Sequence, residues 1–495
     1  MLKIRTIIGL LLGITSFVQA EPVKIMTFNT FLLAQPPATI GPLTMGDRVD
    51  LMLKGKLFND ADVIVLNEAF TLHDTNRLLD GLSQQGYRWQ TPVLSRAFTP
   101  VEKECNDNQC WNAKKNNWSP LQLENGGVAI VSRHKILQRE QMIFHNKGCG
   151  FDAVAAKGAV YARIALNGSG EIIHVFGTHT QAVDSLCSQG SDAWYRIAQF
   201  EEIRNWVLEK HIPADERVFI AGDLNVNKGS DEYRQMLQHL HVVEPRYEGA
   251  DSTWDPQTNK LTGWSWPGSK GEYLDYVLSF KDNVDAGITL RALQPSSAPD
   301  FFHYSAANFA EYSDHYPVVA YTPGAEAVPA FKAKDSARYQ NVVLKSQLDG
   351  RYIAGSSGEY LTLTADKSQA HRFSLYEWID TGKELWPSSC LLPNPGTYLK
   401  IKSAGSNNFW EMWRPNGVYY LDSKSASYDL YLSAVDKTHR GCLELGDVVS
   451  LSDMRISTLT HYYLQVDSSN RVSLSGRMLS DAPQQQQQFT LEVAQ

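Results

Sequence analysis

Short apolar runs rich in β-branched residues recur between residues 24 and 321 of the chain. They cover residues 24–28, 63–66, 128–131, 172–176, 218–221, 276–278 and 318–321. Runs of this length and composition are typical of buried strands. The segments 194–210 and 231–240, which lie between them, carry the apolar spacing of helices. Strands that alternate with helices predict a layered α/β domain over residues 21–322.

The pattern changes beyond residue 322. Residues 323–335 are rich in Pro, Gly and Ala, which predicts a linker. In residues 336–495, short strand patterns alternate with Gly, Asn and Ser turns, so we expect a β-rich C-terminal module. The strand pattern of residues 342–375 recurs in residues 448–491, with a middle copy near 398–401. Three units of about fifty residues predict a β-trefoil-like module, and a β-sandwich is the alternative.

Residues 1–20 have the features of a signal peptide. Lys3 and Arg5 precede an apolar run that is too short for a membrane span, and Val18-Gln19-Ala20 resembles a cleavage site. An uncleaved N-terminal anchor is the alternative. We expect a mature chain that begins near Glu21 and is secreted.

Export changes the interpretation of the six cysteines, because an oxidising compartment favours disulfides. Six cysteines allow fifteen connectivities. Proximity along the chain suggests the pairs Cys105–Cys110, Cys149–Cys187 and Cys390–Cys442. A zinc site is disfavoured, because no Cys pair lies near a His pair at ligand spacing.

The formal net charge of the chain is −8, and loss of Lys3 and Arg5 would take it to about −10. Proteins that bind nucleic acid without sequence preference carry a basic face. The charge therefore argues mildly against a nucleic-acid partner, although a local basic patch would be compatible with it.

Six short polar motifs stand at the ends or starts of apolar runs in the first domain. They are Phe28-Asn29, Asn67-Glu68, Gly177-Thr178-His179-Thr180, Gly222-Asp223-Leu224-Asn225, Leu274-Asp275-Tyr276 and Ser313-Asp314-His315. Each motif alone is also explained by a turn, a helix cap or a buried ion pair. Because strand ends converge on one rim of a layered α/β domain, the ordered set predicts a single cleft.

The residue types in these motifs suit metal-assisted phosphodiester hydrolysis. A carboxylate at Glu68 with an amide at Asn29 suits Mg²⁺, which takes oxygen ligands. Asp223 and Asn225 lie two apart on an extended segment and point the same way, so they can share a water or a substrate oxygen. A buried carboxylate at Asp275 could orient the imidazole of His315, which would act as general base.

Longer strings carry a resemblance to a known family. They include His174 to Gln181, Asp184-Ser185-Leu186-Cys187, Gly148-Cys149-Gly150 with Lys157-Gly158, and Tyr312 to Val318. The motif set resembles the endonuclease/exonuclease/phosphatase superfamily and, within it, bacterial neutral sphingomyelinase C. The resemblance covers residues 22–322. It implies a four-layer α/β sandwich of the DNase I-like type and supports the Cys149–Cys187 disulfide.

The resemblance also implies a role for each matching position. Glu68 would be the main Mg²⁺ ligand, with Asn29 near the metal; Mn²⁺ or Co²⁺ are possible substitutes. His315 would be the general base, oriented by Asp275 and supported by Asp314. Asp223 and Asn225 would position water and phosphate, and His179 would stabilise the phosphate and the leaving group.

An aromatic loop precedes Ser313-Asp314-His315 and includes Phe301 and Phe302. The corresponding segment of the family resembles a hairpin that enters the lipid surface, where aromatic side chains suit the interface; inward packing is the alternative. The first hypothesis is a secreted sphingomyelin phosphodiesterase that releases ceramide and phosphocholine, with haemolysis as a possible consequence. An exported nuclease and a binding protein with a decayed site are the alternatives. The sequence does not indicate the ligand of the C-terminal module.

Overall fold

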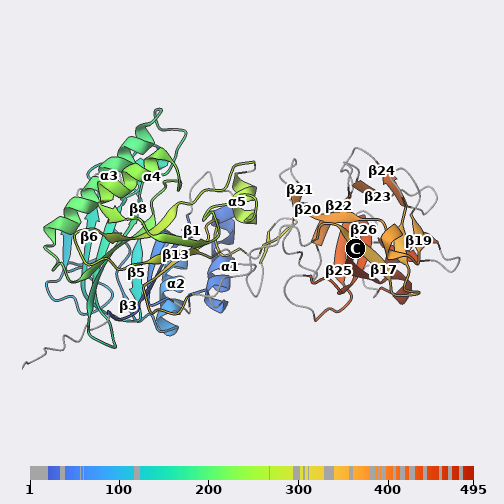
Figure 1. Ribbon diagram of the computed structural model, residues 1–495, viewed down its shortest axis with the longest axis horizontal. Coiled ribbons are helices and arrows are strands. Elements are labelled where there is room, and N and C mark those ends of the chain that lie inside the picture. Colours follow the sequence, from blue (N-terminus) through green and yellow to red (C-terminus); the bar gives the residue numbers. More distant parts are fainter. Residues whose placement is uncertain are drawn as a thin grey trace, which may run out of the picture.

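The computed structural model consists of an α/β body, built from residues before 328, and a β-rich body, built from residues after 338 (Figure 1). In the α/β body the structure describes residues 20–33, 40–55, 57–58, 61–97, 99–115, 123–266, 268–293, 302–304, 307–309 and 311–327. In the β-rich body it describes residues 339–355, 361–378, 385–387, 391, 397–404, 409–412, 419–422, 430–438, 443–455, 460–466, 471–478 and 483–494.

Two seven-stranded sheets form the centre of the α/β body, counted over its described residues. The first has the order β11 (Arg246–Gly249), β13 (Thr289–Ala292), β16 (Val318–Tyr321), β1 (Lys24–Leu32), β2 (Val63–Ala69), β5 (Ala129–Ser132) and β3 (Trp89–Gln90). The second has the order β10 (Val242–Val243), β12 (Asp275–Phe280), β9 (Arg217–Asp223), β8 (Ile172–His179), β7 (Gly158–Ala165), β6 (Lys135–Ile143) and β4 (Ala113–Lys115).

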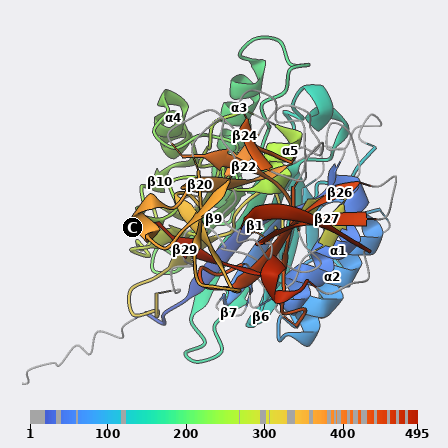
Figure 2. The ribbon, with the colours of Figure 1, turned by 90° about the vertical axis from the view of Figure 1, so that its right-hand side faces the viewer.

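Helices cover the outer faces of both sheets. Helices α1 (Ile40–Lys54) and α2 (Leu72–Gln84) lie on the side of the first sheet, and α3 (Ser191–Glu209) and α4 (Asp231–Leu240) lie on the opposite side (Figures 1 and 2). The short α5 (Lys260–Ser265) and the 3₁₀ helix η1 (Gly150–Val154) lie in connections. The resulting order of helices, sheet, sheet and helices is the predicted four-layer α/β sandwich, and the prediction is confirmed.

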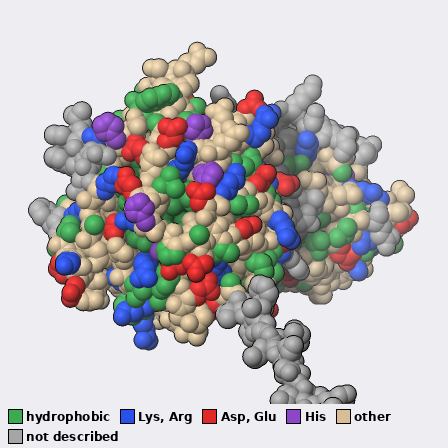
Figure 3. All heavy atoms as spheres, turned by 60° about the vertical axis from the view of Figure 1, so that its left-hand side comes forward, with side chains coloured by type: hydrophobic (Ala, Val, Ile, Leu, Met, Phe, Trp, Pro, Cys, Tyr) green, Lys and Arg blue, Asp and Glu red, His purple; other side chains and the backbone are tan. Residues whose placement is uncertain are grey.

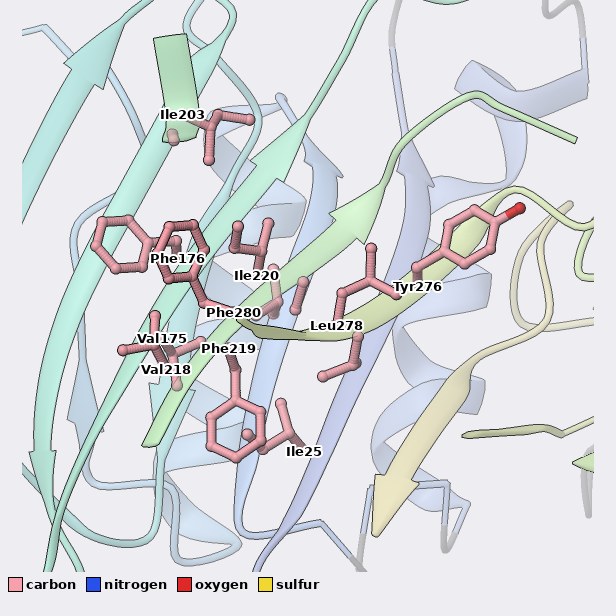
Figure 4. Close-up of a cluster of buried hydrophobic side chains, with 14 of the residues drawn as sticks. Ile25, Val175, Phe176, Ile203, Val218, Phe219, Ile220, Tyr276, Leu278 and Phe280 are labelled. Carbon is pink, nitrogen blue, oxygen red and sulfur yellow. The ribbon is translucent and has the colours of Figure 1, made fainter. Parts of the chain in front are cut away.

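The layered packing explains why the sequences of these strands are unbroken apolar runs. In β2, Val63 and Val65 join the cluster between the two sheets, whereas Ile64 and Leu66 join the cluster beneath α1 and α2. Successive side chains of a strand point to opposite faces, and here both faces are buried. Figure 4 shows part of the first of these clusters, to which β8, β9 and β12 contribute large apolar side chains and which continues to Ile203 of α3.

In the β-rich body, the described strands pair into a closed ring. The ring runs β17 (Val342–Ser346), β20 (Phe373–Trp378), β22 (Thr397–Ser403), β25 (Leu430–Ala434), β26 (Val448–Arg455), β29 (Phe489–Val493) and back to β17. Three pairs extend from it: β18 (Tyr352–Ala354) with β19 (Thr362–Thr364), β23 (Phe409–Met412) with β24 (Tyr419–Asp422), and β27 (Thr460–Val466) with β28 (Val472–Met478). Strand β21 (Leu385–Pro387) pairs with β20, and η2 (Lys367–Gln369) and η3 (Gln485–Gln487) are single 3₁₀ turns.

A six-stranded ring with three attached pairs repeats a four-strand unit three times. This pairing favours the predicted β-trefoil over the β-sandwich, because a sandwich keeps two open sheets. Trp410 is buried within the core of this body, so its indole is unavailable as a surface contact. All-β character of the C-terminal part, as predicted, is confirmed.

Two of the predicted disulfides are confirmed, Cys105–Cys110 and Cys149–Cys187. Cys390 and Cys442 lie outside the described residues, so their pairing stays a prediction. The residues that follow them contact each other, because the backbone N–H of Leu443 donates to the carbonyl of Leu391 at 2.8 Å.

Other predictions fall wholly or partly outside the described residues. Phe301 is outside them, and Phe302 opens β14 (Phe302–Tyr304), which pairs with β15 (Ala307–Phe309) as a hairpin. Residues 1–19, nearly all of the predicted signal peptide, and most of the predicted linker are also outside. None of the described helices combines the length and the apolar character that a membrane crossing needs.

Gly222 is the position where the backbone geometry depends most clearly on glycine. Its φ is +156°, and an added Cβ would lie 1.8 Å from the carbonyl oxygen of Thr178 on the neighbouring strand β8. We expect G222A to lower the free energy of unfolding by about 3 kcal/mol or more, through backbone strain and forced separation of β8 and β9. Urea denaturation measures this.

Gly229 supplies the matched control, because its φ is +83° but an added Cβ would meet no atom within 4 Å. We expect G229A to cost only about 1 kcal/mol from the left-handed backbone. Equal losses for the two variants would contradict the close approach at Gly222.

Candidate active site

Polar side chains from both sheets meet at one end of the sandwich. Asn29 and Glu68 lie near the carboxyl ends of the parallel strands β1 and β2. His179 and Asp223 are the last residues of the parallel strands β8 and β9 and stand opposite each other in register. Strand β12 runs antiparallel to β9 and begins at Asp275, opposite Asp223. Residues nearly 250 positions apart are thus gathered by sheet pairing, as the motif order predicted.

A pocket of about 490 Å³ opens at this end. Its lining includes all the predicted site residues except Asn29 and Asp275, namely Glu68, His179, Asp223, Asn225, Asp314 and His315. Asn29 and Asp275 are fully buried behind the pocket wall and reach it through hydrogen bonds. All eight predicted side chains therefore belong to one site.

His315 and Asp275 form a buried pair. The Nδ1 atom of His315 lies 2.9 Å from Asp275 Oδ2, and the hydroxyl of Thr253 donates to the same carboxylate oxygen at 2.6 Å. With Nδ1 engaged in this way, Nε2 is the ring atom left to act on a substrate. The nearest carboxylate oxygen described at Nε2 is Asp223 Oδ2, at 3.8 Å.

The electrostatics of His315 follow from these neighbours. Burial disfavours its charge, but the carboxylates of Asp275 and Asp223 outweigh burial and raise the pKa of His315 well above its usual value. The imidazole of His179 behaves oppositely. Burial, with a smaller contribution from Lys157 and His315, lowers the pKa of His179 well below its usual value, so this side chain is neutral.

Asn29 links two carboxylates across the site. Its amide nitrogen lies 3.0 Å from both Glu68 Oε1 and Asp223 Oδ2, and its carbonyl oxygen accepts from the backbone N–H of Phe31 at 3.0 Å. In this orientation, Asn29 donates to the acidic groups and holds them in place. To offer an oxygen to a metal, as the sequence suggested, the amide would have to turn over.

Glu68 is suited to hold a hard divalent cation. Its Oε2 atom is buried and has no hydrogen-bond partner among the described residues. Burial, followed by the nearby charge of Asp314, raises the pKa of Glu68 to about 7, although the Asn29 hydrogen bond opposes this. An ionised carboxylate in such a place calls for a positive partner, and oxygen-binding ions such as Mg²⁺ supply one.

A second arrangement near the pocket also brings possible ligands together. One ligand atom each from Asp223, Asp275 and His315 lie within 4.8 Å of one another. His315 and Asp275 already bond to each other, whereas Asp223 is linked to Glu68 through the amide of Asn29. Burial, then repulsion by Asp275, raises the pKa of Asp223 to about 6. Divalent metal binding fits this acidic site.

Asn225 and its loop are fixed by backbone contacts. Asn225 has a φ of +52°, its N–H donates to Asp223 Oδ1 at 3.0 Å, and its side-chain amide donates to the Thr180 carbonyl at 3.1 Å. The buried ammonium of Lys157 donates to the same carbonyl at 2.7 Å and to Asp152 Oδ2 at 2.7 Å. Lys157 belongs to a string that marked the family resemblance, but its position beneath the site had no sequence signal.

Arg48 is a second residue that the motifs did not reveal. Its buried guanidinium donates to the carbonyls of Thr30 at 2.7 Å and Phe31 at 2.5 Å, which fixes the turn after Asn29. Burial lowers the pKa of Arg48 to about 10, opposed by the charges of Asp314 and Glu68. Arg48 lies within α1, where a single basic residue is ordinary, so only the fold shows its role.

Comparisons with known proteins agree with this geometry. Residues 31–315 match the model of the Endonuclease/Exonuclease/phosphatase family. Sphingomyelinase C 2 of Leptospira interrogans is 32% identical over 450 residues, which cover 90% of this chain and 68% of that protein. Sphingomyelinase C of Bacillus cereus is 38% identical over 317 residues, which cover 62% of this chain and 90% of the relative.

Solved structures give the same result. Sphingomyelinase C from Streptomyces griseocarneus superposes with a TM-score of 0.55 at 33% identity, over 61% of this chain and all of that one (100%). A Staphylococcus aureus beta toxin variant with bound magnesium ions gives a TM-score of 0.55 at 36% identity. This match covers 61% of this chain and 100% of the toxin chain. The chain therefore belongs to the sphingomyelinase C family of the endonuclease/exonuclease/phosphatase superfamily, and it is a phosphodiesterase.

Proposed function

We propose that the protein is an exported Mg²⁺-dependent phosphodiesterase that hydrolyses sphingomyelin to ceramide and phosphocholine. One observation carries the proposal: the His315–Asp275 pair, joined at 2.9 Å, shares a pocket with a Glu68 carboxylate oxygen that has no partner among the described residues. A base and a cation site side by side are the two parts that metal-assisted phosphodiester hydrolysis needs. Membership of the sphingomyelinase C family supports the choice of lipid.

His315 is the proposed general base. Asp275 accepts the Nδ1 proton and so leaves Nε2 free to take a proton from the attacking water. The Thr253 hydroxyl holds the Asp275 carboxylate in one orientation, which fixes the plane of the imidazole. For this role the ring must be neutral at the moment of attack.

Glu68 is the proposed cation ligand, with Asn29 beside it. A divalent cation at Glu68 would polarise the phosphoryl oxygens and, through its charge, lower the pKa of the neighbouring imidazolium. Mg²⁺ fits the oxygen ligands, and Mn²⁺ or Co²⁺ can use the same set.

The remaining polar groups position the phosphodiester. We assign water and phosphate orientation to Asp223 and Asn225, which the Asn225 N–H and the Asn29 amide hold rigidly. His179 is neutral, with its Nε2 3.6 Å from Asp223 Oδ2, and can donate a hydrogen bond to the phosphate or the leaving oxygen. Asp314 supports the loop, because the Ser313 hydroxyl lies 3.1 Å from its Oδ1 and 2.6 Å from the Asn29 carbonyl.

The β14–β15 hairpin is the proposed contact with the lipid surface. It stands two residues before Glu311 and so leads directly into the loop of Asp314 and His315. Phe301 and Phe302 would enter the interface, and haemolysis would follow where the membrane is that of an erythrocyte. Vesicle sedimentation of the double variant F301A/F302A tests this, and unchanged binding would overturn it.

Export after cleavage behind Ala20 is also proposed. The Glu21 N–H donates to Glu171 Oε2 at 2.8 Å, and Arg217 donates to Glu171 Oε1 at 2.8 Å and to the Glu21 carbonyl at 2.7 Å. A new α-ammonium group at Glu21 would therefore face a carboxylate. N-terminal sequencing of secreted protein tests the cleavage position.

A substrate comparison tests the proposed function. Purified protein is incubated with sphingomyelin vesicles and with plasmid DNA, each with Mg²⁺ and with EDTA. We expect phosphocholine release only with the metal and no nicking of DNA; on the face drawn in Figure 3, acidic and basic side chains are interspersed and form no continuous basic surface among the residues described there. DNA nicking without phosphocholine release would select a nuclease, and inactivity on both substrates would favour a binding protein.

Replacement of Glu68 by Gln should stabilise the metal-free protein at alkaline pH and abolish its activity. The raised pKa, about 7 against an ordinary 4.5, means that the folded protein holds this proton more tightly than the unfolded chain. Stability therefore falls as pH rises from about 4.5 to 7, by on the order of 3 kcal/mol, and stays lost above pH 7. In EDTA at pH 8, E68Q should melt at a higher temperature than the native protein, although it has lost activity.

Mg²⁺ should raise the melting temperature of the native protein but not that of E68Q, because only the ionised carboxylate attracts the cation. The exposed Asp80 of α2 gives the matched control, and D80N should keep the native response. A full Mg²⁺ response in E68Q would show that another group holds the metal.

The His315–Asp275 pair predicts a characteristic pH profile. H315A should lower turnover by at least about 10²-fold at every pH. Because Asp275 helps to raise the pKa of His315, D275N should move the acid limb of kcat/KM to lower pH, since the imidazole then loses its proton more easily. An unshifted limb in D275N would mean that another group sets the pH dependence.

A further inference from the structure

One wall of the pocket has no part in the chemistry described above. Two half-buried tryptophans line it, Trp254 and Trp266, together with Glu272. The indole ring centroids are 5.5 Å apart and the ring planes meet at 63°, so the two rings form an angled aromatic corner. Neither tryptophan belongs to a motif that the sequence singled out.

Trp254 is held directly beside the catalytic pair. Its backbone exchanges hydrogen bonds with Glu272, N–H to carbonyl, at 3.0 and 2.8 Å, and it stands opposite His315 as an isolated β-bridge. The preceding residue, Thr253, donates to Asp275 and accepts from the N–H of Tyr316 at 2.6 Å. The aromatic wall and the base are therefore parts of one hydrogen-bonded unit.

Trp266 is fixed by the helix that precedes it. Its N–H donates to the Thr262 carbonyl at 2.8 Å, and the Thr262 hydroxyl donates to the Asp314 carbonyl at 2.5 Å. The buried ring of Phe31 lies 6.4 Å from the Trp266 indole between centroids, with the ring planes tilted by 50°. The position of Trp266 is thus set by the same loop that carries His315.

Glu272 adds a negative charge to this corner. Among the described residues its carboxylate makes no hydrogen bond or ion pair, although its backbone is fully engaged with Trp254. Burial raises the pKa of Glu272, opposed by the charges of Arg196 and His315. A carboxylate that shares one pocket with two indoles suits a cation that cannot donate hydrogen bonds.

We propose that Trp254, Trp266 and Glu272 form a subsite for the quaternary ammonium group of a choline head group. The proposal rests on the proposed function and extends it to head-group selectivity. A trimethylammonium group is large, weakly hydrated and without N–H donors, so aromatic faces and a carboxylate attract it by cation–π and Coulomb interactions. A primary ammonium of similar charge keeps its hydration and gains less from indole faces.

The location suits this assignment. The same pocket of about 490 Å³ is lined by the indole corner and by Glu68 and His315. A phosphodiester placed at His315 therefore brings the short choline arm toward the neighbouring wall. Lys270 also lines the pocket, but it is exposed, so its ammonium can remain in water.

Paired lipid substrates test the subsite. kcat/KM is measured in identical mixed micelles of sphingomyelin and of ceramide phosphoethanolamine for the native protein, W254L, W266L and E272Q. We expect the native protein to prefer sphingomyelin, and each variant to lose about tenfold on sphingomyelin through KM, with a loss of less than about threefold on the ethanolamine lipid. W254F should recover part of the preference because it restores an aromatic face.

Trp264 supplies the matched control. Its ring packs on Phe309, with 5.8 Å between centroids, and it is not part of the pocket lining. W264L should therefore keep the native selectivity. Equal losses of kcat/KM on both lipids in W254L and W266L would overturn the subsite, and so would a native protein without head-group preference. Neither result would contradict the proposed hydrolysis of sphingomyelin.

A binding measurement separates the subsite from catalysis. Calorimetric titration of H315A with tetramethylammonium, a probe of the cation alone, should give a heat of binding that W254L and E272Q in the same background lose. Absence of binding to H315A, or binding that persists unchanged in both double variants, would overturn the proposal. If the native protein releases no phosphocholine at all, the proposed function itself is wrong. That result differs from an active enzyme whose variants keep the native head-group selectivity.

Discussion

The crowding of acidic groups at the end of the two sheets is the constraint on which the rest of the structure depends. Glu68, Asp223, Asp275 and Asp314 converge on one largely buried pocket. Burial raises the pKa of three of them, Glu68, Asp223 and Asp314, because their charges are costly there. The fold tolerates this cluster only through hydrogen-bond donors and positive charge, and a bound divalent cation would complete the balance. The same acidic surroundings suit a divalent cation and raise the pKa of His315.

Rigid elements hold this unfavourable cluster in place. The carboxylates lie on or beside paired strands of two sheets that are buried on both faces, so their positions are fixed by main-chain hydrogen bonds. Local strain accompanies the arrangement: Phe31, Glu68 and Asn225 all have φ values near +50°, a region that residues other than glycine rarely adopt. Arg48 and Lys157 fix the turns beside them through backbone carbonyls. The strained backbone and the buried charges lower the stability of the fold, and they hold the side chains of the site in fixed positions.

The two bodies have different distributions among relatives. The match to Bacillus cereus sphingomyelinase C covers 62% of this chain, whereas the match to the Leptospira interrogans protein covers 90%. The α/β body therefore carries the chemistry that the family shares, and the ring of strands after it is an addition that some members also contain. Closure of that ring leaves its six strands without an open edge, and described edges lie on the attached pairs at β19, β24 and β28.

The sequence by itself determined which segments become strands and which polar residues terminate them, because continuous apolar runs and strand-end motifs are local signals. These signals predicted a layered α/β domain and eight polar residues that the fold brings together at one end, and the positions of the cysteines predicted the two described disulfides. The four-layer sandwich came from the family resemblance. Only the tertiary structure decided which atoms face each other. The Asn29 amide turns its nitrogen toward Glu68 and Asp223, and Arg48 reaches carbonyls from a helix. Trp254 and Trp266 come from loops without a motif and meet through hydrogen bonds to Glu272 and to the Asp314 loop. Such contacts arise between distant segments, so no local pattern encodes them.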